Sequence, residues 1–122
     1  MTLLEANGRK CDFLRQWAPP NAAVVQGRAE EQETDRFGVA VAKALAAPPV
    51  AAEWCLPLVR TGGVVVLWVG ESLERERVAA VAERLSGELE TAPEGFVLLR
   101  KTGPTPPGFP RRAGIARKRP LA

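Results

Sequence analysis

The chain has 122 residues, 46% hydrophobic and 25% charged, with 17 basic and 14 acidic residues, a balance typical of one soluble globular domain. It contains no histidine, which excludes Ser-His-Asp and Cys-His catalysis and histidine-bound metals, and its two cysteines, Cys11 and Cys55, lack metal-ligand spacing and are expected to be reduced and packed. No apolar run approaches the ~20 residues that span a bilayer, and the N-terminus shows no signal peptide, so a cytoplasmic location is expected.

Apolar periodicity and Gly/Pro punctuation divide the chain into short alternating strands and helices. The first strand runs from Thr2 to Glu5, and Asn7 can then cap a helix over Arg9–Trp17, which Pro19-Pro20 stops. The further elements, in chain order, are strands over Ala22–Val25 and Phe37–Ala42, a helix opened by Pro48-Pro49, a strand over Val64–Val69, a helix over Leu73–Leu85, and a strand pair over Glu88–Thr91 and Phe96–Lys101. This alternation predicts an α/β doubly wound sheet.

Aromatic residues fall mostly at helical or strand-interior spacing, which favours core packing over base stacking. The residues expected in the core on this basis are Phe13, Trp17, Phe37, Trp54 and Trp68. Phe109, which lies within a basic segment, is the exception and could stack on a nucleotide.

The end of the chain is a basic, Pro-rich arm. From Arg100 to Ala122 there are seven basic residues and no acid, whereas residues 1–99 hold ten basic against 14 acidic residues. Five of the eleven prolines lie in this arm and are expected to keep it extended. The candidates for phosphate contact are Arg111, Arg112, Arg117, Lys118 and Arg119. The alternative to phosphate contact is a solvated tail. Residues 1–100 are interpreted as a partial domain and residues 101–122 as its arm.

Five segments resemble one known family when they are taken in order. They are Leu3–Arg15, the G-R-A-E-E run at 27–31, Val41–Ala46, Glu53–Leu58 with Thr61-Gly62-Gly63, and the closing P-T-P-P-G-F-P-R-R-A-G-I-A-R-K-R-P-L at 104–121. Together they resemble the C-terminal portion of the RsmG/GidB family, the 16S ribosomal RNA guanine-N7 methyltransferases. The resemblance covers nearly all of the chain.

The resemblance implies a Rossmann-like S-adenosylmethionine methyltransferase sheet that is truncated before its second strand. In that fold the first strand, which carries the Gly-rich cofactor turn, lies between the second and fourth strands. Without it, the strands at Thr2–Glu5 and Ala22–Val25 are expected to form no ladder with those at Phe37–Ala42 and Val64–Val69, and two edges stay unpaired. Because the family's N-terminal helical region is also missing, the chain is interpreted as a C-terminal fragment, a protein with a mis-assigned start, or a degraded gene product.

The same resemblance implies cofactor contacts at four residues: Glu5, Ala29, Glu30 and Lys43. Glu5 would accept both ribose hydroxyls, and Ala29 and Glu30 would lie beside the adenine. The alternative for Glu5 is a solvated acid at a turn, and for Glu30 it is an exposed acidic loop that also contains Glu31 and Glu33.

Three positions differ from the family pattern. Lys43 replaces a family Arg and keeps the charge but loses the planar fork, so its contacts would be weaker. Val69 falls where the family has Lys, and Ala116 replaces a family Pro.

The function implied by the resemblance is methyl transfer from S-adenosylmethionine to guanine N7 of 16S ribosomal RNA or the small ribosomal subunit. Guanine N7 has an in-plane lone pair, so no general base is needed and the lack of histidine is compatible with this reaction. No catalytic residue is identified, and no metal or membrane partner is expected. The alternatives are a non-catalytic RNA-binding module and a non-functional gene fragment.

Overall fold

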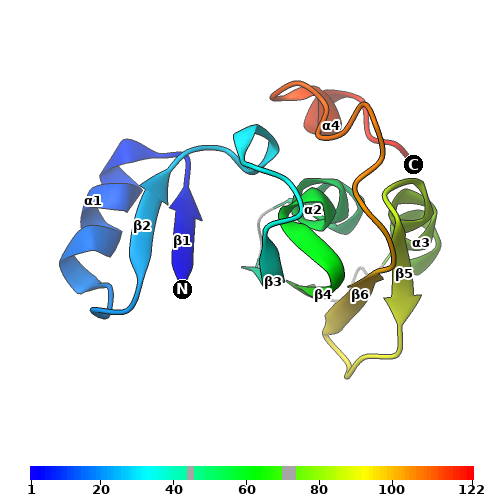
Figure 1. Ribbon diagram of the computed structural model, residues 1–122, viewed down its shortest axis with the longest axis horizontal. Helices are drawn as coiled ribbons and strands as arrows, with labels where there is room; N and C mark the ends of the chain where they lie inside the picture. Colours follow the sequence, from blue (N-terminus) through cyan, green and yellow to red (C-terminus); the bar gives the residue numbers. More distant parts are fainter. Residues whose placement is uncertain (44–45, 70–73) are drawn as a thin grey trace.

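The computed structural model describes residues 1–43, 46–69 and 74–122, and its elements follow the predicted alternation (Figure 1). The strands are β1 (Thr2–Glu5), β2 (Ala23–Gln26), β3 (Phe37–Lys43), β4 (Val59–Trp68), β5 (Gly87–Glu90) and β6 (Phe96–Lys101). The helices are α1 (Gly8–Trp17), α2 (Pro48–Cys55), α3 (Arg75–Arg84) and α4 (Ile115–Lys118), with short 3-10 turns η1 (Ala29–Glu31) and η2 (Leu56–Leu58). The expected helix start at Leu73, and Ala44, Leu45 and Gly70, lie outside the described residues.

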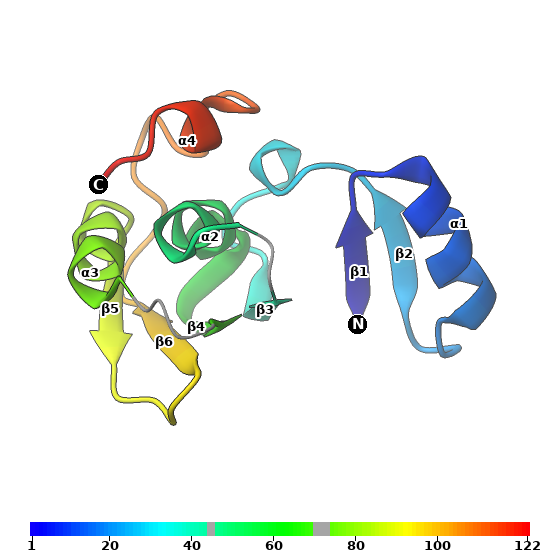
Figure 2. The same cartoon turned by 180° about the vertical axis from the view of Figure 1, so that it is seen from behind.

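The strands form two separate sheets, as the absence of the family's first strand predicts. β1 and β2 pair in parallel, and the second sheet has the order β3-β4-β6-β5. In the second sheet β3 and β4 are parallel, whereas β6 is antiparallel to both β4 and β5. No ladder joins the two sheets among the described residues, and both Figures 1 and 2 show β1 on the side of its sheet nearer to β3. The predicted break in the sheet is therefore confirmed.

The unit formed by β1, α1 and β2 has almost no core. Asn7 caps α1 as predicted, because its Oδ1 accepts hydrogen bonds from the backbone N–H groups of Arg9 and Lys10 at 3.0 and 3.1 Å. Cys11 is the one fully buried residue of the unit among the described residues, and its thiol donates to the carbonyl of Glu5 at 3.2 Å.

The main core lies between one face of the four-stranded sheet and helices α2 and α3. Alternate residues of β4 and β6 point into it, as the period of two along a strand requires. Its members include Ala52, Leu56, Val59, Val65, Leu67, Val78, Val81, Leu85, Val97 and Leu99. The opposite face of the sheet carries Val39 and Val41, which are exposed, so one face is covered and the other is open.

β4 begins five residues earlier than the predicted strand and includes Gly62 and Gly63. The register between β3 and β4 shifts between Phe37 and Val39, which absorbs the extra residues as an irregularity of the bulge type. At Gly63 a Cβ atom would lie 2.8 Å from the carbonyl oxygen of Gly38, so only glycine fits this close approach. The glycine pair therefore permits a bulge inside the strand.

The aromatic residues do not all lie in the core. Trp54 is buried as predicted, and Phe37 is half-buried beneath the guanidinium of the neighbouring Arg36. The prediction is wrong for Phe13, Trp17 and Trp68, which are 62%, 68% and 49% exposed. Each lies on an apolar surface against which no layer of the described residues packs.

Candidate cofactor edge and nucleic-acid interface

Glu5 ends β1 opposite Gln26, the last residue of β2, at the carboxyl edge of this parallel pair. Ligands of doubly wound sheets bind at this edge. The Glu5 carbonyl accepts the N–H of Gly27 at 2.9 Å, which fixes the strand end. Its carboxylate is 28% exposed and lies 3.8 Å from the ammonium of Lys10. A shallow, open hollow is lined by Glu5, Arg9, Lys10, Phe13 and Leu14. The carboxylate is thus accessible to a ligand from solvent.

The η1 turn follows β2 and contains both residues expected beside the adenine. Ala29 is half-buried and packs against a small cluster formed by Val50, Trp54 and Ala116. Glu31, by contrast, is exposed, as expected for an acidic loop. The Ala29 side of η1 is therefore packed against α2 and α4, whereas the Glu31 side faces solvent.

Glu30 is not part of an exposed acidic loop, because its carboxylate is only 6% exposed. Its Oε2 atom accepts hydrogen bonds from Arg28 Nη2 at 3.0 Å and from the backbone N–H of Gly114 at 3.1 Å. Burial alone would raise the pKa of Glu30, but the hydrogen bonds from Arg28 and Gly114, with the charge of Arg28, lower it overall. The carboxylate is therefore engaged within the chain itself.

Lys43 ends β3 beside Trp68, the last residue of β4, at the carboxyl edge of the second parallel pair. Its ammonium lies 4.4 Å from the centroid of the Trp68 ring, within the range of a cation–π contact. Trp68 also stacks on Phe96, with ring centroids 5.3 Å apart. Lys43 and Glu5 thus end strands of different sheets, and the structure does not bring them together through a common ladder. Val69 follows β4 and adds no charge at this edge.

The arm is not simply extended, because it contains α4 and is docked on α2 (Figures 1 and 2). Arg111 forms a two-pronged ion pair with Glu53, at 2.7 Å from Nε to Oε2 and 2.5 Å from Nη2 to Oε1. The side chain of Glu53 is only 4% exposed, so Arg111 neutralises a buried carboxylate. Phe109 packs against the main core rather than standing free for a nucleotide.

Four of the five predicted phosphate contacts remain at the surface. They are Arg112, Arg117, Lys118 and Arg119, and all are exposed. None takes part in an ion pair among the described residues, although the guanidinium of Arg117 lies 5.4 Å from the Trp54 ring centroid. The arm therefore presents a cationic surface on one side of α2.

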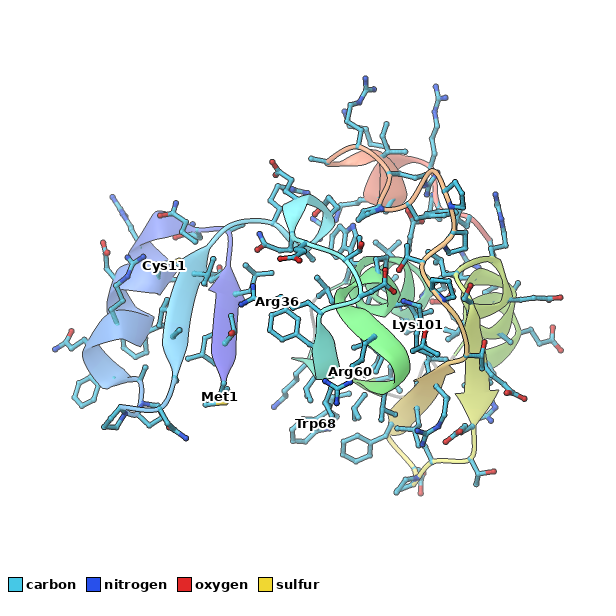
Figure 3. The ribbon with its side chains drawn as sticks, in the orientation of Figure 1. Met1, Cys11, Arg36, Arg60, Trp68 and Lys101 are labelled. Carbon is cyan, nitrogen blue, oxygen red and sulfur yellow. The ribbon has the colours of Figure 1, made fainter. Side chains whose placement is uncertain are left out.

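One of the seven basic residues at the end of the chain, Lys101, is the last residue of β6 and is labelled in Figure 3. Its side chain is fully inaccessible to solvent. The three N–H groups of its ammonium are shared among four oxygens within hydrogen-bond distance: the carbonyls of Leu56 and Val59 and Thr105 Oγ1, each at 2.9 Å, and Asp35 Oδ1 at 3.0 Å. Burial would raise the pKa of Asp35, but its hydrogen bonds from Lys101 and Thr105 lower it. The alternation of buried Val97, Leu99 and Lys101 along β6 was the sequence signal for this burial.

No cluster of metal-binding side chains occurs among the described residues, and no described helix is long and apolar enough to cross a bilayer. Cys11 and Cys55 are free and buried, as predicted, and burial raises the pKa of Cys55 to about 12.

Comparison with known proteins gives one family. Residues 1–92 match the family described as rRNA small subunit methyltransferase G. The chain is 39% identical to the ribosomal RNA small subunit methyltransferase G of Symbiobacterium thermophilum over 99% of its own length and 60% of that relative. It is 37% identical to the protein of the same name from Rubrobacter xylanophilus, covering 99% of this chain and 56% of that one.

Among solved structures, the fold resembles that of the T. thermophilus 16S rRNA methyltransferase RsmC, solved in complex with AdoMet and guanosine. The TM-score is 0.61 at 15% identity, over 87% of this chain and 30% of the other. At this identity the likeness establishes the Rossmann-like methyltransferase fold alone.

Proposed function

Because the chain belongs to the family of ribosomal RNA small subunit methyltransferases G, we propose that it supplies part of an enzyme that methylates guanine N7 in 16S ribosomal RNA. The observation that carries the proposal is the family match over residues 1–92, which include the Glu5 edge, η1 and the end of β3. The chain spans 60% and 56% of the length of the two relatives named above. The proposal therefore concerns an activity to which these residues contribute.

The groups at the Glu5 edge fit the nucleoside part of S-adenosylmethionine. The accessible Glu5 carboxylate can accept hydrogen bonds from two ribose hydroxyls, and Ala29, whose side chain packs against the body of the protein, can present its backbone to the edge of a flat base. Lys43 can attract a carboxylate as a point charge, although without the planar fork of arginine. When bound, the cofactor supplies an electrophilic methyl group.

The residues of this chain would act by positioning. Guanine N7 attacks with an in-plane lone pair, so no side chain has to remove a proton first. The requirements are that Glu5 and η1 orient the donor and that the RNA is held with N7 in line with the methyl group. This explains how a chain without histidine can contribute to the reaction.

The arm is the proposed RNA contact. Residues 1–99 carry more acidic than basic residues and would repel phosphates, whereas the arm has no acidic residue of its own. Arg112, Arg117, Lys118 and Arg119 are exposed and can each approach a phosphate. The proposed partner is 16S ribosomal RNA or the small ribosomal subunit, and the proposed location is accordingly the cytoplasm.

A non-catalytic RNA-binding module is the second candidate function. It is favoured by one observation, namely that the cationic arm is well docked while the two halves of the cofactor edge lie on separate sheets. In that case RNA would bind without methyl transfer.

Methyl transfer to small ribosomal subunits that lack the modification tests the proposal. We compare the 122-residue chain with a fusion in which the N-terminal portion of the Symbiobacterium thermophilum relative precedes Met1. The chain alone is expected to bind S-adenosylmethionine weakly, with a Kd above about 1 mM, and the fusion is expected to methylate guanine N7.

In the fusion, Glu5→Gln is expected to raise the KM for the cofactor about ten-fold or more, because it weakens hydrogen bonds to a charged acceptor. Glu88→Gln, which changes an exposed acid of β5, is the matched control and is expected to have no effect. A folded fusion that binds RNA without transferring a methyl group would support the second candidate instead.

A further inference from the structure

The arm and η1 are directly bonded, although the bonded residues are 84 positions apart. The backbone N–H of Gly114 donates to Oε2 of Glu30, and the same oxygen accepts the hydrogen bond of Arg28. Because this carboxylate is only 6% exposed, water competes little for either bond. Glu30 is therefore a junction between the two segments.

A second contact joins the same two segments through apolar side chains. Ala29, from η1, and Ala116, from α4, pack against the same cluster with Val50 and Trp54 of α2. The guanidinium of the exposed Arg117 lies 5.4 Å from the centroid of the Trp54 ring in that cluster. A phosphate that draws Arg117 away would thus disturb a ring that also bears on Ala29.

The segment from Arg111 to Arg119, which contains α4, is anchored at both ends. Arg111 is held by both oxygens of Glu53 and also donates from Nη2 to the carbonyl of Arg119 at 2.8 Å. The segment between these two anchored positions contains Gly114, the donor to Glu30.

We propose that Glu30 is a positioning residue that couples the cationic arm to η1, so that RNA on the arm changes the turn beside which the cofactor base is expected. The proposal rests on the proposed function and deepens it, because it links the RNA-contacting surface to the cofactor edge. Glu30 then acts within the chain, through its bonds to Arg28 and Gly114, rather than by touching the cofactor. Binding of RNA and cofactor would be reciprocal, as for any linked pair of sites.

Hydrogen exchange of the 122-residue chain tests the bond without any ligand. Glu30→Ala is expected to speed the exchange of the Glu31 and Gln32 amides, at the end of η1, and of the Lys118 and Arg119 amides, at the end of α4, about ten-fold. Glu30→Gln, which keeps an acceptor for Gly114, is expected to restore most of the protection. Glu31→Ala is the matched control, since this neighbouring glutamate is exposed, and it is expected to leave α4 unchanged. Faster exchange confined to η1 would overturn the proposal.

Titration with a single-stranded oligonucleotide of small-subunit ribosomal RNA sequence tests the coupling. The NMR probes are the η1 amides and the indole N–H of Trp54, which is buried and has no hydrogen-bond partner among the described residues. Both are expected to shift in proportion to RNA bound, and in Glu30→Ala the η1 shifts are expected to disappear while RNA still binds.

Unmoved η1 amides in the parent chain at full RNA saturation would overturn the coupling. A failure of RNA to bind would remove the proposed RNA contact and the coupling with it. The exchange experiment separates the failure of the coupling from the failure of RNA binding. If Glu30→Ala speeds amide exchange in both η1 and α4 but the chain binds no RNA, the bond between Glu30 and Gly114 is purely structural.

Discussion

Two regions of this chain share the same parallel β-α-β order but differ in burial. In the first, β1-α1-β2, helix α1 buries only Cys11. In the second, β3-α2-β4, every residue of α2 from Pro49 to Cys55 is buried. The difference lies in what surrounds each helix, since α2 is packed between the sheet, α3 and the arm. A β-α-β unit thus acquires a core only when further elements cover it.

The largest expected effect is a difference in amide exchange between the two regions. We expect the amides of β1, α1 and β2 to exchange at least about 1,000-fold faster than those of β4 and β6, because local opening of the first region exposes little apolar surface. Hydrogen exchange followed by mass spectrometry measures this directly. Equal protection in both regions would show that the first region is stabilised by contacts absent from the structure.

The next effect is on thermal stability. Lys101→Met removes the donor to four buried or half-buried oxygens and is expected to destabilise the second region by about 3 kcal/mol, lowering Tm by roughly 10 °C or more. Lys10→Met, at an exposed lysine of the first region, is the matched control and is expected to change Tm little. Circular dichroism melting distinguishes them, and equal shifts for both variants would contradict the assignment of Lys101 as a buried anchor.

A smaller effect concerns RNA binding. Replacing Arg112, Arg117, Lys118 and Arg119 by Gln is expected to lower the log–log salt slope of RNA binding by up to about three, at about 0.7 per phosphate contact. Arg111→Gln is expected instead to lower Tm, because it leaves Glu53 buried and unpaired, with little change in slope. Salt titration of binding, alongside melting, tests this division, and a slope unaffected by the four substitutions would reduce the arm to a solvated surface.

The smallest effect is on acid stability. The folded pKa of Asp35 lies below its ordinary value of 3.8, so its contribution to stability is present above about pH 4 and is lost as the pH falls through the folded pKa. Asp35→Asn is expected to make Tm fall less steeply between about pH 5 and pH 3. The corresponding difference in the free energy of unfolding is at most about 1 kcal/mol. Because the pKa of Glu30 is lowered too, the measurement compares Asp35→Asn with its parent at each pH. An identical pH profile in the variant would show that Asp35 does not titrate in this way.

Local features of the fold were predictable from sequence. The element order, the Asn7 cap and the gap between the two sheets follow from periodicity, capping chemistry and family resemblance. The exposure of Phe13 and Trp68 did not follow, because periodicity identifies an apolar face but does not say whether another element covers it.

The site was predictable only in part. The position of Glu5 at a strand end was foreseen, since it depends on neighbouring residues alone. The pairings of Glu30 with Gly114 and of Glu53 with Arg111 were not, because each joins residues far apart in sequence. A single acid in the apolar helix α2 was the one local sign that Glu53 needed a partner.

The ion pair between Glu53 and Arg111 also constrains how this sequence can diverge. Replacing either residue alone leaves a buried charge without its counterion, at a cost of about 3 kcal/mol, whereas replacing both by apolar residues is close to neutral. Positions 53 and 111 are therefore expected to covary in an alignment of descendants. Arg112, the next residue along the chain but exposed, is expected to drift independently of α2. The two adjacent arginines are thus expected to evolve under different constraints, because only Arg111 is paired with a residue of α2.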